Sequence, residues 1–178
     1  MNVLLGITGA IACYKVCSLV RLMKTAGWNV RVVATDSALA FVGEITWRTL
    51  SQNPIERSAF TESPDWHPRH IELADWCDVF VVAPLSANTM AKLAQGLADN
   101  LLTQTALANT KPLLLAPSMN THMWEHPATQ ANVQTLLSRG AKLLTPGDGY
   151  LACGVTGAGR LPEPEDLFTQ IKALCAQP

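Results

Sequence analysis

Short runs of aliphatic residues alternate along this chain with longer amphipathic segments, and this alternation is the strongest constraint on its fold. Strands are expected at residues 3–7, 30–34, 78–83, 112–116 and 141–144. Helices are expected at residues 10–26, 37–50, 86–108, 127–139 and 164–176. Continuous aliphatic strands separated by helices are typical of a parallel sheet that is covered on both faces. The pattern therefore predicts an α/β fold, a single-domain Rossmann-like (flavodoxin-like) parallel sheet with helices on both faces.

The first expected helix shows the pattern most clearly. The residues that recur at helical spacing, and are expected to form its buried stripe, are Val16, Leu19, Val20 and Met23. Gly27 follows the helix and is expected to end it. Residues 51–69 contain three prolines and are expected to be an irregular excursion. Because no other break in the pattern is visible, residues 1–178 are expected to form one domain.

The composition excludes several classes of function. Of the 178 residues, 48% are hydrophobic and 15% are charged, which is typical of a compact globular protein. The formal net charge of −1 provides no electrostatic basis for binding nucleic acid. Apolar runs are shorter than the roughly 18 residues that span a bilayer, so no membrane partner is expected.

The cysteines indicate a reducing compartment. The chain has five of them, scattered and without the spacing of zinc ligands, so no metal site is expected. Free thiols are typical of cytoplasmic proteins. The N-terminal residues lack the basic segment of a signal peptide, and a cytoplasmic location is therefore expected.

Candidate binding residues follow the first two expected strands. In open parallel sheets, ligands bind outside the carboxyl ends of the strands. Gly9 and Ala10 open the first helix, where backbone N–H groups can bind a phosphate. The Gly-x-Gly-x-x-Gly fingerprint of dinucleotide-binding proteins is missing. After the second strand, Ser37 can donate to a phosphate, and Asp36 can hold a ribose or cap a helix.

Two later strands each end in a proline followed by polar residues. Residues 84–89 present Ser86, Asn88 and Thr89 at an expected helix start, and capping accounts for one of them. Asn120, after the next strand, can hydrogen-bond a carboxylate or an amide. Met123 follows it as part of an apolar wall, although core packing is the more common role of any one such methionine.

A glycine-rich segment and a histidine complete the set of candidates. Residues 147–160 hold five of the chain's 11 glycines. Such a loop can bring Cys153 to a bound substrate as an acid or a nucleophile, or it can be an ordinary surface loop with an inert thiol. Histidine is the usual general base near neutral pH, so His70 is the natural base if it faces the site, although a lone histidine is more often structural.

Taken together, these motifs resemble the homo-oligomeric flavin-containing cysteine decarboxylases over residues 2–175. Residues 84–89 match the family's Pro-Ala-Ser-Ala-Asn-Thr box with Leu85 in place of alanine, and residues 117–124 match its Pro-x-Met-Asn-x-x-Met-Trp box. Residues 70–73 match the segment with the catalytic histidine. The segments 151–154 and 157–160 match the flap that closes over the substrate.

The flap cysteine distinguishes branches of that family. Relatives that oxidatively decarboxylate a peptide's C-terminal cysteine lack it, so Cys153 points to the branch that acts on 4′-phosphopantothenoyl-L-cysteine in coenzyme A biosynthesis. The resemblance implies that FMN oxidises the carbon next to sulfur to a thioaldehyde and that CO₂ then leaves to form an enethiol. Return of the hydride, with a proton, yields 4′-phosphopantetheine.

The resemblance also implies a role for each matching residue. His70 would be the base and Cys153 the acid, and a flap at about residues 147–162 would carry Cys153. The residues expected to contact the substrate are Asn120, Met123, Ala152 and Gly154. The residues expected to hold FMN are Gly9, Ala10, Ser37, Phe41, Ser86, Asn88 and Thr89.

The family also suggests partners. FMN at a subunit interface is expected, in a trimer or a dodecamer, so His70 can act on flavin that is held mainly by a neighbour. A phosphopantothenate–cysteine ligase is expected as a fused or separate partner. The alternatives are a peptidyl-cysteine decarboxylase, a non-catalytic scaffold or regulatory subunit, and a nicotinamide dehydrogenase, which the missing glycine fingerprint disfavours.

Overall fold

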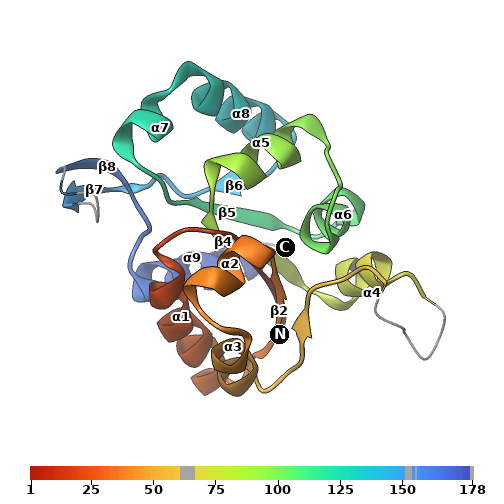
Figure 1. The fold of residues 1–178 in the computed structure, drawn as a ribbon. Helices are drawn as coiled ribbons and strands as arrows, with labels where there is room; N and C mark the ends of the chain where they lie inside the picture. The colour runs from red at the N-terminus through yellow and green to blue at the C-terminus, as the bar shows by residue number, and fades with distance from the viewer. Residues whose placement is uncertain (61–66, 151–153, 155, 177–178) are drawn as a thin grey trace.

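A six-stranded parallel sheet forms the centre of the molecule (Figure 1). The computed structural model describes residues 1–60, 67–150, 154 and 156–176. The strands of the sheet are β1 (Asn2–Ile7), β2 (Asn29–Ala34), β3 (Ile55–Glu56), β4 (Val79–Leu85), β5 (Leu113–Pro117) and β6 (Lys142–Leu143). Their order is β3-β2-β1-β4-β5-β6, and each neighbouring pair is parallel. The predicted fold class is confirmed, and the order of strands reverses between β1 and β4, where such sheets bind ligands.

Helices cover both faces of the sheet, as predicted. They are α1 (Cys13–Thr25), α2 (Asp36–Phe41), α3 (Glu44–Ser51), α4 (Arg69–Trp76), α5 (Ala87–Gln95), α6 (Leu101–Ala108), α7 (Thr121–Glu125), α8 (Pro127–Ser138) and α9 (Pro164–Cys175). One core cluster joins the sheet to α1, α3 and α9, and a second joins it to α4, α5, α6 and α8 (Figure 1). In the part of the chain that the structure describes, no helix is long and apolar enough to cross a membrane.

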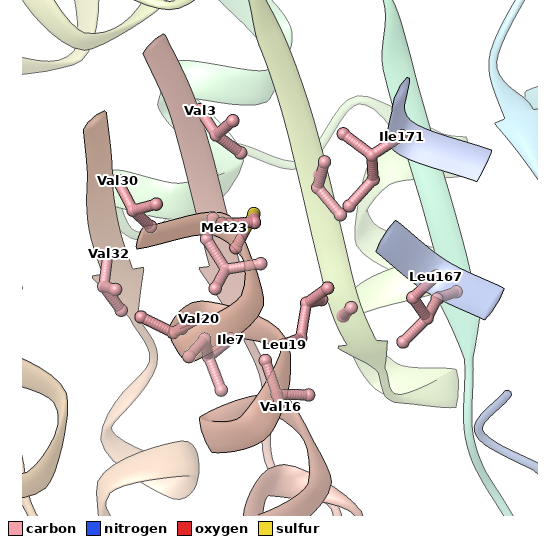
Figure 2. Packing of buried hydrophobic residues seen from close by; sticks show 14 of the residues in the cluster. Val3, Ile7, Val16, Leu19, Val20, Met23, Val30, Val32, Leu167 and Ile171 are labelled. Carbon is pink, nitrogen blue, oxygen red and sulfur yellow. The ribbon is translucent and has the colours of Figure 1, made fainter. Parts of the chain in front are cut away.

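The buried stripe of α1 explains how the first core cluster forms. Figure 2 shows this stripe against β1 and β2, with α9 beside it. The predicted stripe residues Val16, Leu19, Val20 and Met23 are all fully buried. Each such aliphatic side chain contributes roughly 1.5–3 kcal/mol when it leaves water. Because successive residues of a strand point to opposite faces, Leu4 of β1 packs in the second cluster.

Two of the predicted helices are each divided in two. The expected helix 37–50 is interrupted because Val42 is extended, with φ −137°, so α2 ends and α3 begins after it. The expected helix 86–108 ends its first part at Gly96, whose left-handed φ of +71° stops α5. Asn100 then starts α6 with a capping box that includes Thr103.

The expected excursion at residues 51–69 contains more structure than the prolines suggested. It holds the two-residue strand β3, which pairs with β2, and it ends at the start of α4. The predicted glycine-rich loop likewise includes a hairpin, formed by the antiparallel strands β7 (Gly147–Tyr150) and β8 (Thr156–Arg160). Both elements were missed because neither has a long apolar run.

Candidate active site

A cavity of about 500 Å³ opens at the carboxyl ends of β1, β4 and β5, where β8 passes over them. Five residues predicted from the sequence line it, namely Gly9, Ala10, Ser86, Asn120 and Met123. Its volume lies in the range of small-molecule and cofactor sites. The structure therefore brings the two proline-containing boxes and the first turn together at the point where the strand order reverses.

The turn between β1 and α1 suits an anion. Helix α1 has no side-chain cap and no acidic residue in its first turn. Among the residues that the structure describes, the N–H groups of Gly9, Ala10 and Ile11 donate no backbone hydrogen bond, whereas that of Cys13 donates to Ala10 at 3.0 Å. Unpaired N–H groups at the positive end of a helix favour a phosphate.

Ser37 lies against this turn. A Cβ on Gly9 would come within 2.6 Å of the Ser37 Cβ, so the close approach requires glycine at this position. Ser37 itself is exposed, as is half of the Phe41 side chain at the other end of α2. Neither Ser37 nor Phe41 lines the cavity. Both lie on the element that adjoins the phosphate turn, and their assignment to FMN stays a prediction.

Thr8, which the sequence reasoning missed, ties β1 to β4 beside the cavity. Its fully buried hydroxyl donates to the Pro84 carbonyl at 2.7 Å and accepts from the Ser86 N–H at 2.7 Å. These two bonds hold the first turn at a set distance from the Ser86 box. The available signal was a polar residue directly after a fully buried strand, because such a residue needs a hydrogen-bond partner.

Ser86 of the Ser86 box caps helix α5. The Ser86 hydroxyl accepts from the Thr89 N–H at 3.3 Å and donates to the Thr89 Oγ1 at 3.3 Å. Capping therefore accounts for one of the three polar side chains, that of Ser86, as expected. Thr89 is buried and Asn88 is exposed, and neither lines the cavity. Ser86 does line it, and the FMN contacts of all three stay predictions.

Asn120 reaches the cavity because it caps α7. Its Oδ1 accepts from the His122 N–H at 2.9 Å, which fixes the side chain at the start of this short helix. Met123 follows one turn later and, with Met119, forms an apolar wall. Trp124 instead packs against the second core cluster, as expected of a core residue.

The hairpin is docked on the chain that follows β5. The Thr121 hydroxyl donates to the Ala158 carbonyl at 2.8 Å, and the Met119 N–H donates to the Gly159 carbonyl at 3.0 Å. A Cβ on Gly157 would lie 2.6 Å from Thr121 Oγ1, and one on Gly159 would overlap the carbonyl oxygen of Met119. Gly157 and Gly159 therefore allow close packing of the backbone, and their role is not mobility.

The structure describes only some of the predicted flap residues. Ala152 and Cys153 lie outside the described residues, and their roles stay predictions. Gly154 is exposed, has a left-handed φ of +85° and does not line the cavity. The hairpin residues that do line it include Tyr150 and Arg160, which the sequence reasoning did not single out.

Two basic side chains at the cavity share one carboxylate. Lys15 Nζ lies 2.6 Å from Glu163 Oε1, and Arg160 Nη2 lies 3.3 Å from the same oxygen. Two cations against one anion leave a positive charge beside the cavity, which favours a phosphorylated ligand. Lys15 was visible in the sequence as a charge within the apolar stretch of the first helix, but its partner is 148 residues away.

His70 is not brought into this cavity. It lies in α4, which packs against α6 on the side of the molecule opposite to the β7–β8 hairpin (Figure 1). In the described part of the chain, His70 is half-buried and no hydrogen bond or ion pair holds its side chain. Within one chain, the predicted base and the predicted carboxylate-binding residue therefore belong to separate regions.

The described thiols and carboxylates supply no other reactive centre. Burial raises the pKa of the Cys13, Cys17 and Cys175 thiols and raises that of Cys77 to about 11, so these four are expected to be inert. Within residues 1–60, 67–150, 154 and 156–176, no cluster of His, Cys, Asp and Glu is arranged to hold a metal ion.

Comparison with known proteins identifies the family. Residues 1–176 match the Flavoprotein family. This chain belongs to the Flavoprotein family. The chain is 46% identical over 166 residues to the coenzyme A biosynthesis bifunctional protein CoaBC of Bacillus subtilis, covering 93% of this chain and 41% of the relative. It is 41% identical over 176 residues to the CoaBC of Haemophilus influenzae, covering 99% of this chain and 44% of the relative. The chain thus spans about two fifths of the length of these curated relatives.

Solved structures of similar proteins have the same fold as this chain. A cysteine-to-serine mutant of PPC decarboxylase complexed with pantothenoylaminoethenethiol superposes with a TM-score of 0.89 at 36% identity, over 99% of this chain and 98% of that one. The FMN-dependent cysteine decarboxylase SpaF has a TM-score of 0.87 at 29% identity, over 99% and 98% of the two chains. The FMN-binding protein AtHal3 has a TM-score of 0.84 at 37% identity, over 97% and 95%.

Proposed function

We propose that this chain binds FMN and decarboxylates 4′-phosphopantothenoyl-L-cysteine to 4′-phosphopantetheine in coenzyme A biosynthesis. The observation that carries the proposal is that the turn suited to an anion, Asn120 and an apolar methionine wall line the same cavity. The similarity to PPC decarboxylase, at 36% identity over 99% of the chain, and to the CoaBC proteins supports it.

The residues at the cavity fit FMN. A phosphate is matched by the unpaired N–H groups of Gly9 and Ala10, with the Ser37 hydroxyl beside them. When bound, FMN supplies two-electron oxidation of the substrate carbon next to sulfur and the return of the same electrons later in the reaction. Thr8 holds the turn and the Ser86 box together, so both can contact one cofactor.

Asn120 is proposed to bind the substrate carboxylate until it leaves as CO₂. Its amide group can donate to the carboxylate while its Oδ1 stays bonded to the backbone of α7. Met119 and Met123 give this side of the cavity an apolar lining. Cys153 is proposed to donate a proton to carbon in the last step, and Ala152 and Gly154 are proposed to flank the substrate in the flap.

His70 is proposed to act as a base on the cavity of a neighbouring copy. Its distance from the cavity of its own chain supports this arrangement, as do the exposed apolar side chains of Ile11, Phe41, Ile45 and Ile71, which suit contacts between copies. We therefore infer a homo-oligomer, a trimer or a dodecamer, in the cytoplasm. The bifunctional relatives support a ligase partner, either fused to this chain or separate.

A second candidate is the oxidative decarboxylation of a peptide's C-terminal cysteine. The chain is similar to SpaF, an FMN-dependent cysteine decarboxylase, with a TM-score of 0.87, and a cysteine at the end of a peptide is the other substrate that this chemistry suits. The two reactions differ at the last step, because the peptide reaction stops at the oxidised enethiol and needs no proton from a flap cysteine. Cys153 therefore favours the complete reaction over the peptide reaction.

One anaerobic experiment tests the proposal. The purified protein is mixed with 4′-phosphopantothenoylcysteine while the flavin spectrum and the product masses are followed. The expected result is CO₂, 4′-phosphopantetheine and flavin that returns to the oxidised state. Bound flavin without turnover would favour the peptide reaction or a scaffold role, and a colourless protein that takes up no FMN would refute the proposal.

Cys153→Ser separates the two halves of the reaction. This variant is expected to release CO₂ but to accumulate the enethiol and leave the flavin reduced, because the proton donor for the last step is gone. Mass spectrometry of the product and the flavin absorbance measure both effects. A normal yield of 4′-phosphopantetheine from the variant would show that Cys153 is not the donor.

A further inference from the structure

The helix turn that carries His70 has little local support. Helix α4 begins at Arg69, and its N-cap residue, Pro68, offers no side-chain hydrogen bond. The backbone bonds at this end are those from the Ile71 and Glu72 N–H groups to the Pro68 carbonyl, at 2.9 and 3.1 Å. Because Pro68 does not cap the helix with its side chain, contacts from outside the helix contribute to the position of its first turn and of His70.

The side chain of Arg69 anchors the first turn of α4 to the sheet. Its Nε donates to Glu56 Oε2 at 2.8 Å, and its Nη2 donates to Glu56 Oε1, so the guanidinium grips both carboxylate oxygens. Only 5% of the Glu56 side chain and 16% of the Arg69 side chain is exposed. A two-pronged contact of this kind fixes orientation as well as distance, since the planar fork fits the carboxylate in one arrangement.

Glu56 is itself held by the sheet. It lies in β3, where it pairs with Val33 of β2, so Arg69 connects the start of α4 directly to the edge of the sheet. Glu56 keeps the positive charge on Arg69 favourable, which raises the pKa of the guanidinium further. An ion pair this well buried is costly to break, because the remaining charge would be left without a partner.

A second contact lies one turn further along α4. Arg69 Nη1 donates to Glu72 Oε2 at 2.6 Å, and Arg31 Nη1 of β2 donates to Glu72 Oε1 at 3.0 Å. The Arg31 guanidinium also lies 4.6 Å from the centre of the Trp76 ring, near the end of the helix. The positive charges of Arg31 and Arg69 balance the negative charges of Glu56 and Glu72, so the network has no net charge to attract an ion. It acts as a brace that holds α4 against β2 and β3.

We propose that Glu56 and Arg69 are positioning residues for His70, because their ion pair sets the place and the rotation of the helix turn that presents the imidazole. The inference rests on the proposed function, in which His70 is the base. The geometry explains why a charged pair stands at this point. Leu73 packs α4 into the second core cluster, and the two-pronged ion pair adds a directional contact at the first turn of the helix.

The test compares Glu56→Gln with Lys92→Gln. Glu56→Gln keeps the shape of the side chain and removes its charge. Lys92→Gln breaks the Lys92–Asp99 ion pair, at 2.5 Å on another helix and away from His70, and serves as the matched control. Misplacing a reacting group by about 1 Å can cost on the order of 100-fold in rate. We expect Glu56→Gln to slow flavin reduction at saturating substrate about 10- to 100-fold, with KM changed less than about twofold.

A second readout does not depend on activity. The chain has four histidines, so the ¹H–¹⁵N signal of the His70 imidazole can be assigned with His70→Asn. In Glu56→Gln this signal is expected to broaden or split, because the imidazole samples more than one position. Lys92→Gln is expected to leave the signal and the rate of flavin reduction as in the wild type.

The outcomes separate positioning from simple stabilisation. A lower melting temperature of Glu56→Gln, with an unchanged reduction rate and a single sharp His70 signal, would overturn the proposal. If Glu56→Gln does not fold, Arg69→Lys replaces it, since lysine keeps the charge and loses the two-pronged grip. Wild-type rate and signal in Arg69→Lys would then overturn the proposal. Failure of the proposed function appears differently, as normal flavin reduction by His70→Asn, and the positioning role would fall with it.

Discussion

Two regions of this molecule hold the predicted chemistry, and they are built by different means. The cavity is built mainly by contacts with the backbone. These are a glycine turn, the helix caps formed by Ser86 and Asn120, and a hairpin that docks by backbone hydrogen bonding and close packing. The region around His70 is held by buried and half-buried charges, chiefly those of Glu56 and Arg69. The cavity region holds residues that are proposed to bind and orient the ligands, whereas His70, the proposed base, does not line that cavity. The proposed reaction needs both regions, and we propose that two copies of the chain supply them.

The largest effect is expected from a change inside the cavity. Asn120→Asp places a negative charge against the substrate carboxylate, and such like-charge contacts cost several kcal/mol, equivalent to a loss of roughly a thousandfold in turnover. Aspartate caps a helix as well as asparagine does, so α7 and the bound FMN are expected to remain. Turnover and flavin content are measured on the same sample. A wild-type rate would remove Asn120 from carboxylate binding.

A mixing experiment tests whether the two regions cooperate across copies. Co-expression of His70→Asn with Asn120→Asp is expected to restore turnover that neither variant has alone, because a mixed oligomer contains some sites with both intact residues. Activity is assayed on hetero-oligomers that are purified through two different tags. Mixed oligomers without activity would place both residues in one chain's site, or show that His70 is not the base.

The docking of the hairpin predicts a moderate loss of stability. Gly159→Ala puts a Cβ into the carbonyl of Met119 at a φ of +137°, and Gly27→Ala is the matched control, with φ +78° and nothing within 4 Å. Left-handed strain alone costs about 1 kcal/mol, and the added overlap brings the expected loss for Gly159→Ala to about 2–3 kcal/mol. Urea denaturation measures both variants. Equal losses would mean that the hairpin moves away from Met119 at no cost.

The smallest effect concerns Glu72 in the brace of α4. Burial acts to raise the pKa of this carboxyl, but hydrogen bonds from Arg31 and Arg69 outweigh it and lower the pKa. A lowered pKa in the folded state stabilises the protein above the unfolded value of about 4.3, and this contribution is lost as the pH falls through the folded value. Its size is expected to be about 1 kcal/mol or less. Glu72→Gln should therefore flatten the acid limb of the stability profile, and an unchanged limb would contradict the lowered pKa.

Local patterns in the sequence predicted much of the cavity. The aliphatic runs predicted the parallel sheet, and the turn at Gly9, the Ser86 box and Asn120 each follow a strand end. Because parallel strands place their carboxyl ends at one edge, residues far apart in the chain were expected to meet there, and Gly9, Ser86 and Asn120 do. Phe41 was carried over from the resemblance alone, and it does not line the cavity. Asn88 and Thr89 were singled out as polar residues at a helix start, and neither of them lines it.

What the sequence by itself determined is the order of strands and helices, the buried stripe of α1 and the chemistry at the strand ends, because each depends on residues close together in the chain. Only the tertiary structure decided which charges pair. Lys15 finds Glu163 across 148 residues, and Arg69 finds Glu56 on a two-residue strand that no periodicity marks. It also decided that His70 lies apart from the cavity, since the direction in which a helix docks depends on packing and ion pairs that no local pattern encodes.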